Sequence, residues 1–216
     1  MTCTLVLPVK PFAEGKSRLA PMLEAVERAS LARNCFLHVL ATVRAGAPDV
    51  RLEVHSRCPE VLRLAGNAGV AEDGQTLIDV LEAARGRAIR RADAHFMVLF
   101  ADLPLITASD VQDLVRATIR SGFVLCPDRA GSGTNALGLS LGVNLPFLFG
   151  QDSFARFGRA ASALGYSPER LVTAGLATDL DTPEDLVLIR QHQGAIALTQ
   201  GARPCLDPPD KCGVKA

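Results

Sequence analysis

Short apolar segments alternate along the chain with longer segments in which apolar residues recur at helical spacing. The apolar run over residues 4–9 is rich in strand-forming residues and ends in a polar, basic stretch, which is typical of a buried strand that leads into a surface loop. Further strands are predicted over residues 51–55, 95–100, 123–126, 136–141 and 172–180.

Helical spacing and capping residues characterise most of the segments between these strands. Helices are predicted over residues 24–44, 60–64, 77–89, 107–119, 153–164 and 183–193. Thr107 with Asp110 forms a capping-box pattern, and Thr182 followed by Pro183 is a typical helix start. The alternation indicates an α/β fold, a mostly parallel sheet covered by helices on both faces, with ligands bound beyond the carboxyl ends of the strands.

The composition fits one folded domain. The 216 residues are 48% hydrophobic and 21% charged, which allows a sizeable core. We expect that domain to span residues 1–193, and residues 194–216 to form a mobile tail because prolines and glycines crowd there and apolar residues are sparse. Positive and negative residues both number 23, so no general nucleic-acid partner is expected.

Cysteine and histidine usage argues against a metal knuckle or a disulfide framework. The six cysteines and four histidines are scattered, without a C-x-x-C pair, which favours reduced thiols in a cytoplasmic protein. The N-terminal segment lacks the basic stretch and long apolar run of a signal peptide. Residues 130–151 carry no charge, but glycines, asparagines and a proline interrupt them, so no membrane partner is expected.

A cationic loop follows the first predicted strand. Lys10, Lys16 and Arg18 stand near Gly15 and Ser17, at the place where an α/β sheet normally binds phosphate. The glycine-lysine-serine sequence imitates the end of a Walker A motif, but the glycine required five residues earlier is replaced by Lys10, so this is not a P-loop NTPase. The alternative is a solvated loop whose charges face water.

Three aspartates stand at predicted strand ends. Asp102 follows the strand over 95–100, and the alternate spacing of Asp179 and Asp181 places them on one face if the chain is extended there. Carboxylates together with substrate phosphates are the usual ligands of Mg²⁺, so the three could hold the metal of a nucleoside triphosphate. The alternative is that they cap a turn and the helix that begins at Pro183.

Two further segments could bind an anion. Residues 128–135 combine glycines, hydroxyls and an amide, which leaves backbone N–H groups free to approach an acidic substrate. Gly150 and Ser153 stand just ahead of a predicted helix, whose positive end is another candidate. Either segment could equally be a plain loop.

Several of these segments together are similar to those of a known family. The sequences LPVKPFAEGKSRLAP, FADLPL, PDRAGSGTNAL, FGQDSF and DLDTPEDL resemble the guanylyltransferases of deazaflavin coenzyme F-420 biosynthesis, which act on 2-phospho-L-lactate or phosphoenolpyruvate. The resemblance covers the chain to about residue 190. It implies a Rossmann-like nucleotidyltransferase fold, similar to that of nucleotide-diphospho-sugar transferases, together with GTP and Mg²⁺.

The resemblance also implies roles for particular residues. Asp102, Asp179 and Asp181 match the metal-binding acids, and a phosphorylated three-carbon acid is expected at Thr134, Gly150 and Ser153. We expect Lys10, Lys16 and Arg18 to bind the GTP phosphates, and Lys16, Arg18 and Asp102 to act in catalysis. The family further implies a downstream transferase that takes the product.

The chain departs from the family pattern twice. Gly74, Gln75 and Thr76 replace the usual glycine-leucine-asparagine helix start, which leaves the nucleotide contacts there open. Gln151 and Asp152 replace a proline and a glycine beside the expected acceptor site, so the acceptor could be phosphoenolpyruvate, 2-phospho-L-lactate or 3-phospho-D-glycerate.

Two other functions stay open at this point. A nucleotidyltransferase for molybdopterin or a sugar phosphate shares the fold but usually carries a glycine-rich opening loop, where this chain has Pro8, Val9 and Lys10. A non-catalytic nucleotide-binding regulatory partner would be marked by loss of a metal-binding acid, and all three acids are present. Either a monomer or a homodimer is compatible with the sequence.

Overall fold

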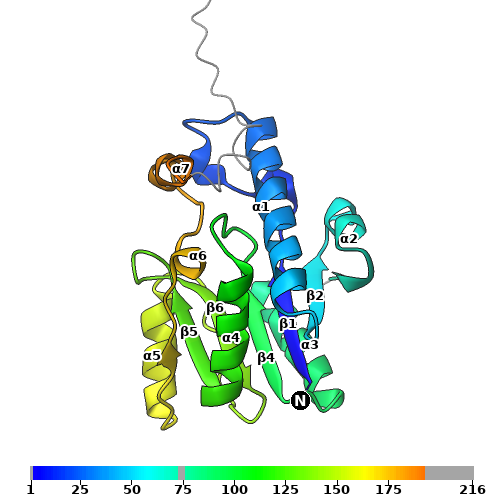
Figure 1. Ribbon diagram of the computed structural model, residues 1–216, viewed down its shortest axis with the longest axis vertical. Coiled ribbons are helices and arrows are strands. Elements are labelled where there is room, and N and C mark those ends of the chain that lie inside the picture. Colours follow the sequence, from blue (N-terminus) through cyan, green and yellow to red (C-terminus); the bar gives the residue numbers. More distant parts are fainter. Residues whose placement is uncertain (1, 73–75, 193–216) are drawn as a thin grey trace, which may run out of the picture.

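The computed structural model describes residues 2–72 and 76–192 of the protein (Figure 1). The chain forms a seven-stranded sheet of order β3-β2-β1-β4-β6-β5-β7. The strands are β1 (Cys3–Pro8), β2 (Arg51–Ser56), β3 (Gly69–Ala71), β4 (His95–Leu99), β5 (Phe123–Pro127), β6 (Thr134–Ser140) and β7 (Glu169–Arg170). The α-helices are α1 (Ala25–Gly46), α2 (Pro59–Ala65), α3 (Leu77–Arg90), α4 (Ala108–Ser121), α5 (Ser153–Ala163), α6 (Ala174–Ala177) and α7 (Pro183–Arg190).

The sheet is mostly parallel, as predicted. β1 pairs in parallel with β2 and β4, with Leu5 opposite Leu52 on one side and Met97 on the other. β2 pairs in parallel with β3, and β5 with β7. Only β6 is antiparallel to its neighbours, β4 and β5. The ends of β1 and β4 that lead into candidate site residues therefore lie at the same edge.

Helices cover both faces of the sheet because its strands are apolar on both sides. Alternate residues of β1 separate the two cores: Leu5 and Leu7 pack with α1 and α4, and Val6 packs with α3 and α5. α1 and α4 cross the near face in Figure 1. A third apolar cluster joins α7 to the first half of α1 through residues that include Leu31 and Leu186, so α7 lies beside the N-terminal half of α1 (Figure 1).

One predicted strand is wrong. Residues 172–180 contain the short helix α6 instead of a strand. The two-residue strand β7 lies just before them. The Thr173 side chain accepts a hydrogen bond from the Leu176 N–H at 3.1 Å and so caps α6. The buried Asn135 amide donates to the carbonyls of Leu176 and Ala177 at 3.0 and 3.3 Å. These side chains satisfy backbone groups that would otherwise need a sheet partner.

The other predicted strands agree with the structure within two residues, and so do the helices up to α5. α7 begins as predicted at Pro183 and ends at Arg190. The short strand β3 and the 3-10 turns Phe12–Glu14, Ser17–Leu19 and Gly66–Ala68 were not predicted. The expected tail over residues 194–216 lies outside the described residues.

Two other expectations concern a membrane partner and the state of the cysteines. Within the described ranges, no helix combines the length and the apolar character needed to cross a membrane. Cys35, Cys58 and Cys126 are free thiols.

Candidate functional site

A cavity of about 860 Å³ opens at the carboxyl ends of β1 and β4. The loop after β1 forms one wall, and α1 and α3 contribute apolar side chains. Of the residues predicted for catalysis, phosphate binding or metal binding, Lys10, Lys16, Arg18, Asp102 and Asp181 all line it. The structure thus brings together the cations that follow β1 and two of the three acids.

Lys16 is the centre of this group. Its Nζ atom lies 2.9 Å from Asp102 Oδ2 and 3.3 Å from Asp181 Oδ1, and only 5% of its side chain is exposed. Burial lowers the pKa of Lys16, but the two carboxylates outweigh it and hold that pKa above its usual value, so the ammonium stays charged.

The backbone at Lys16 is strained. Its φ angle of 58° falls in the left-handed region, which costs a side-chain-bearing residue about 1–3 kcal/mol. In this conformation the long Lys16 side chain places its ammonium between two carboxylates. A glycine would adopt the same backbone without strain but would carry no charge. Strain of this kind is characteristic of functional sites.

Arg18 and Lys10 are more loosely held. The Arg18 side chain is 74% exposed, and its Nη1 atom lies 3.8 Å from Asp181 Oδ2. Lys10 is exposed, and no acid in the described part of the chain forms an ion pair with it. Both side chains therefore keep their charge available to a ligand that enters the cavity.

The third acid, Asp179, lies next to the other two but does not line the cavity. Burial, followed by the nearby Asp102 and Asp181 carboxylates, raises the pKa of Asp179 to about 6. The Leu180 N–H donates to the Asp102 carbonyl at 3.0 Å, which fixes the segment between Asp179 and Asp181 against the end of β4. The three acids converge because of this backbone bond.

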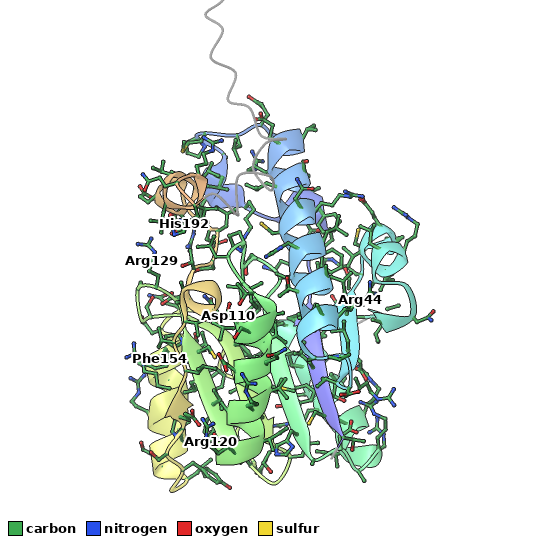
Figure 2. All side chains as sticks on the ribbon, in the orientation of Figure 1. Arg44, Asp110, Arg120, Arg129, Phe154 and His192 are labelled. Atoms are coloured by element: carbon green, nitrogen blue, oxygen red, sulfur yellow. The ribbon has the colours of Figure 1, made fainter. Side chains whose placement is uncertain are left out.

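Asp185 holds the same segment from the other side. Its carboxylate accepts hydrogen bonds from the Asp181 N–H at 3.2 Å, from the Thr182 N–H and hydroxyl at 2.9 Å each, and from Arg129 at 2.8 Å. Burial raises the pKa of Asp185, but these donors outweigh it and keep that pKa below its usual value. Figure 2 shows Arg129 reaching toward α7.

This network removes helix capping as the role of Asp179 and Asp181. Thr182 is the N-cap of α7, and Asp185 completes its capping box. Asp179 and Asp181 therefore do not cap the helix, and their carboxylates are available for another purpose. The roles of Asp185, Arg129 and Asn135 were not predicted, although the Thr-Pro-Glu-Asp sequence contains the capping signal for Asp185.

The three aspartates carry oxygen atoms of the kind that Mg²⁺ prefers. Burial, and then the charges of Asp102 and Asp181, raise the pKa of Asp179, and a bound cation would offset this repulsion between carboxylates. In residues 2–72 and 76–192, no three His, Cys, Asp or Glu side chains stand close enough together to hold a metal ion. The Lys16 ammonium takes the position of counter-ion to Asp102 and Asp181.

A second group lies at the start of α5. The Ser153 hydroxyl donates to the Thr134 hydroxyl at 3.1 Å, and both side chains are buried. Gly150 has a φ angle of 117°, which favours glycine. The structure brings Thr134, Gly150 and Ser153 together but not into the 860 Å³ cavity.

An aromatic contact links the two groups. Phe100 lines the cavity, and its ring meets that of Phe149 edge-on at a centroid distance of 5.2 Å. Phe149 immediately precedes Gly150, so this second group is connected to the cavity wall through packed side chains.

Close packing behind the site leads to a testable expectation at Gly175. A Cβ atom there would overlap the Asp110 carboxylate and lie 2.9 Å from the Ile106 Cα atom; Asp110 stands at the end of α4 near α6 (Figure 2). We expect Gly175→Ala to lower the free energy of unfolding by about 1–3 kcal/mol, measured by urea denaturation.

The matched control is Gly158→Ala in α5, where an added Cβ meets no atom within 4 Å. We expect that variant to be neutral or slightly more stable, because alanine favours a helix interior. Equal effects of the two substitutions would contradict the close packing of α6 on α4.

Comparison with known proteins gives the family. The sequence matches the family described as "Guanylyl transferase CofC like" over residues 3–197. The chain belongs to this family. A phosphoenolpyruvate guanylyltransferase of Sphaerobacter thermophilus is 36% identical over 195 residues, with 89% of this chain and 94% of the relative covered. A 2-phospho-L-lactate guanylyltransferase of Methanoculleus marisnigri is 33% identical, with 87% and 81% covered.

Membership in the CofC-like family makes the protein a nucleotidyltransferase enzyme, which removes the alternative of a non-catalytic nucleotide-binding partner. Solved structures confirm the predicted nucleotidyltransferase fold. A Desulfovibrio desulfuricans protein described as a nucleotide-diphospho-sugar transferase aligns with a TM-score of 0.75 at 18% identity, covering 93% of this chain and 95% of the other. A Leptospira borgpetersenii cytidylyltransferase aligns with a TM-score of 0.56 at 13% identity, covering 93% of each chain.

Proposed function

We propose that this enzyme joins GMP from GTP to the phosphate of a three-carbon phospho-acid, with release of pyrophosphate, in the biosynthesis of coenzyme F-420. The names of its CofC-like relatives support the transferred group and the acceptor class. The single structural observation that carries the proposal is the convergence of a buried lysine and three aspartates at the edge of a nucleotide-sized cavity.

The chemistry needs little acid-base help. An acceptor phosphate has a second pKa of about 6 and is already ionised at neutral pH. One of its oxygens forms a bond to the α-phosphorus of GTP, while the bond from that phosphorus to the bridging β-oxygen breaks and pyrophosphate leaves with the electron pair. The enzyme therefore contributes position and charge neutralisation.

We assign different parts of this binding and charge neutralisation to different residues of the site. The Lys16 side chain is buried and charged, so we assign it to the phosphate where negative charge develops. Arg18 and Lys10 are exposed and offset the remaining triphosphate charge. Asp102, Asp179 and Asp181 would hold Mg²⁺, which when bound supplies positive charge to the phosphates.

The acceptor would bind at the second group. Thr134 and Ser153 offer two hydroxyls, and Gly150 precedes the N-terminus of the eleven-residue helix α5. The N–H groups of Ser153 and Phe154 already donate to the carbonyls of Gly150 and Ser132, so the hydroxyls and the positive end of the helix would hold the anion. The contact between the Phe100 and Phe149 rings would lie at the border where this acceptor site meets the nucleotide cavity.

The product is an activated phosphoanhydride. A molecule of this kind is consumed by displacement of GMP, so a second transferase must act next in the reaction sequence.

Asp152 gives a specific expectation about the acceptor. It is exposed, has a left-handed φ of 52° and directly precedes Ser153. A carboxylate here repels a phosphate unless it accepts a hydrogen bond from a substrate hydroxyl, which 3-phospho-D-glycerate has and phosphoenolpyruvate lacks. We therefore compare kcat/KM for phosphoenolpyruvate with kcat/KM for 3-phospho-D-glycerate. We expect Asp152→Gly to raise the ratio of the first to the second by up to about tenfold.

Asp152→Asn is the control for this change, because asparagine tolerates the left-handed backbone but carries no charge. A charge effect gives the same shift in both variants. An unchanged ratio in both would mean that Asp152 faces water and plays no part in acceptor choice.

The proposal is tested by measuring pyrophosphate release by the purified enzyme with Mg²⁺, each of four nucleoside triphosphates and each of the three phospho-acids. We expect release that needs both substrates and is fastest with GTP. Release that is independent of any phospho-acid, or faster with CTP than with GTP, would overturn it.

A further inference from the structure

Four carboxylates line the cavity, and three of them have a cationic partner. Asp102 and Asp181 bind Lys16, and Glu14 forms an ion pair with Arg57. The fourth is Glu72. Among the described residues, none donates a hydrogen bond to its side chain and none forms an ion pair with it. Glu72 is therefore the acid of the cavity wall with free acceptor capacity.

Glu72 lies at the opposite end of the cavity from the metal-binding acids. It directly follows β3, and its N–H donates to the Ser56 carbonyl at 3.2 Å, which continues the pairing of β3 with β2. In the strand order β3-β2-β1-β4, three strand spacings separate it from the end of β4, where Asp102 stands. Those spacings place the two backbone positions about 14 Å apart, and the side chains that project from both ends shorten this gap toward the length of a nucleoside monophosphate.

The wall between the two ends suits an aromatic ring. Leu77 and Val80 from α3 line the cavity beyond Glu72, and Phe12 and Phe36 line it from the other side. The Phe12 and Phe36 rings pack against each other at a centroid distance of 5.8 Å. The Phe12 and Phe36 side chains are 6% and 0% exposed, so they form the inner layer of this wall. A purine base placed here would meet the half-buried Leu77 on one face and Glu72 at its edge.

The environment of Glu72 favours a ligand that donates hydrogen bonds. Burial raises its pKa, while His55 and Arg57 oppose this from nearby. A partly buried carboxylate without donors is unfavourable until N–H groups reach it. Guanine presents two adjacent donors on one edge, N1–H and the C2 amino group, whereas adenine presents an acceptor at N1.

We infer that Glu72 selects the guanine base by accepting hydrogen bonds from N1–H and the C2 amino group. The inference rests on the proposed use of GTP. It adds the residue that distinguishes GTP from other nucleoside triphosphates, at a position not singled out by the sequence patterns.

The test uses Glu72→Gln with GTP, ITP and XTP in the presence of Mg²⁺ and phosphoenolpyruvate. Inosine lacks the C2 amino group and xanthine has a carbonyl in its place. Glutamine keeps one acceptor and gains a donor, so we expect the GTP-to-ITP ratio of kcat/KM to fall at least about tenfold and XTP to improve relative to wild type. Equilibrium binding of the α,β-methylene analogues of GTP and ITP should change in the same ratio.

Glu14→Gln is the matched control, because it removes an equal charge from the same cavity at an acid that is already paired with Arg57. We expect it to leave the GTP-to-ITP ratio at its wild-type value.

Two failures are distinguishable. Equal losses with GTP and ITP in Glu72→Gln would overturn the inference and leave guanylyl transfer intact, because Glu72 would then contact the ribose or shape the cavity. Absence of turnover by wild type with every triphosphate would overturn the proposed function itself.

Discussion

Replacing Asp102 by asparagine is expected to lower kcat by about 10²–10³-fold with little change in fold. Asp102 is the acid nearest Lys16, at 2.9 Å, and its charge also contributes to the raised pKa of Asp179. The neutral amide removes a negatively charged oxygen from the proposed Mg²⁺ site and weakens the ion pair that holds the Lys16 ammonium. Steady-state pyrophosphate release measures the loss, and the thermal midpoint checks the fold.

Asp113→Asn is the matched control, because Asp113 lies on α4 in an exposed ion pair with Arg116. Exposed pairs of this kind contribute little to stability, so that variant should keep wild-type activity. If Asp102→Asn kept near-wild-type activity at low Mg²⁺, Asp102 would be a structural turn residue and its assignment to the metal would be wrong.

Removal of the Lys16 side chain, as in Lys16→Ala, is expected to lower kcat/KM for GTP by about 10²–10³-fold, through both a higher KM and a lower kcat. The change removes a buried positive charge at the point where the acids converge. Charge that stabilises the transition state more than the bound substrate appears in kcat.

Lys10→Ala provides the comparison for this prediction. Lys10 is exposed, so its loss should raise KM for GTP severalfold and leave kcat almost unchanged. An unchanged kcat/KM in Lys16→Ala would mean that this lysine only neutralises Asp102 and Asp181. The loop after β1 would then be a solvated loop without a role in binding GTP.

Most of the fold could be predicted because local signals agreed with the tertiary structure. The apolar run ending at Pro8 and the capping pair Thr107 with Asp110 each specify an element without help from distant residues. The segment over 172–180 failed because its apolar residues match a strand, whereas the hydrogen bonds that fix it come from Thr173 and from Asn135, which is distant in sequence. Sequence periodicity carries no information about such a long-range donor.

The candidate site could also be predicted only in part. The sequence predicted a ligand site at the carboxyl ends of the strands, where Lys16 and Asp102 both stand, but not the ion pair between them. The left-handed backbone of Lys16 could not be predicted, since nothing in the sequence marks that conformation at a lysine. The role of Asp185 required the structure, because its bonds to Asp181 and Arg129 depend on how α7 is placed.

The most direct measurement of the central claim is the ³¹P NMR spectrum of the product formed from GTP and phosphoenolpyruvate with Mg²⁺. Guanylyl transfer predicts two mutually coupled phosphorus resonances from a new phosphoanhydride between GMP and the acceptor, together with one equivalent of pyrophosphate. A spectrum that shows GDP with inorganic phosphate, or GMP with pyrophosphate and unchanged acceptor, would contradict it, because the phospho-acid would not be the group that attacks the α-phosphorus.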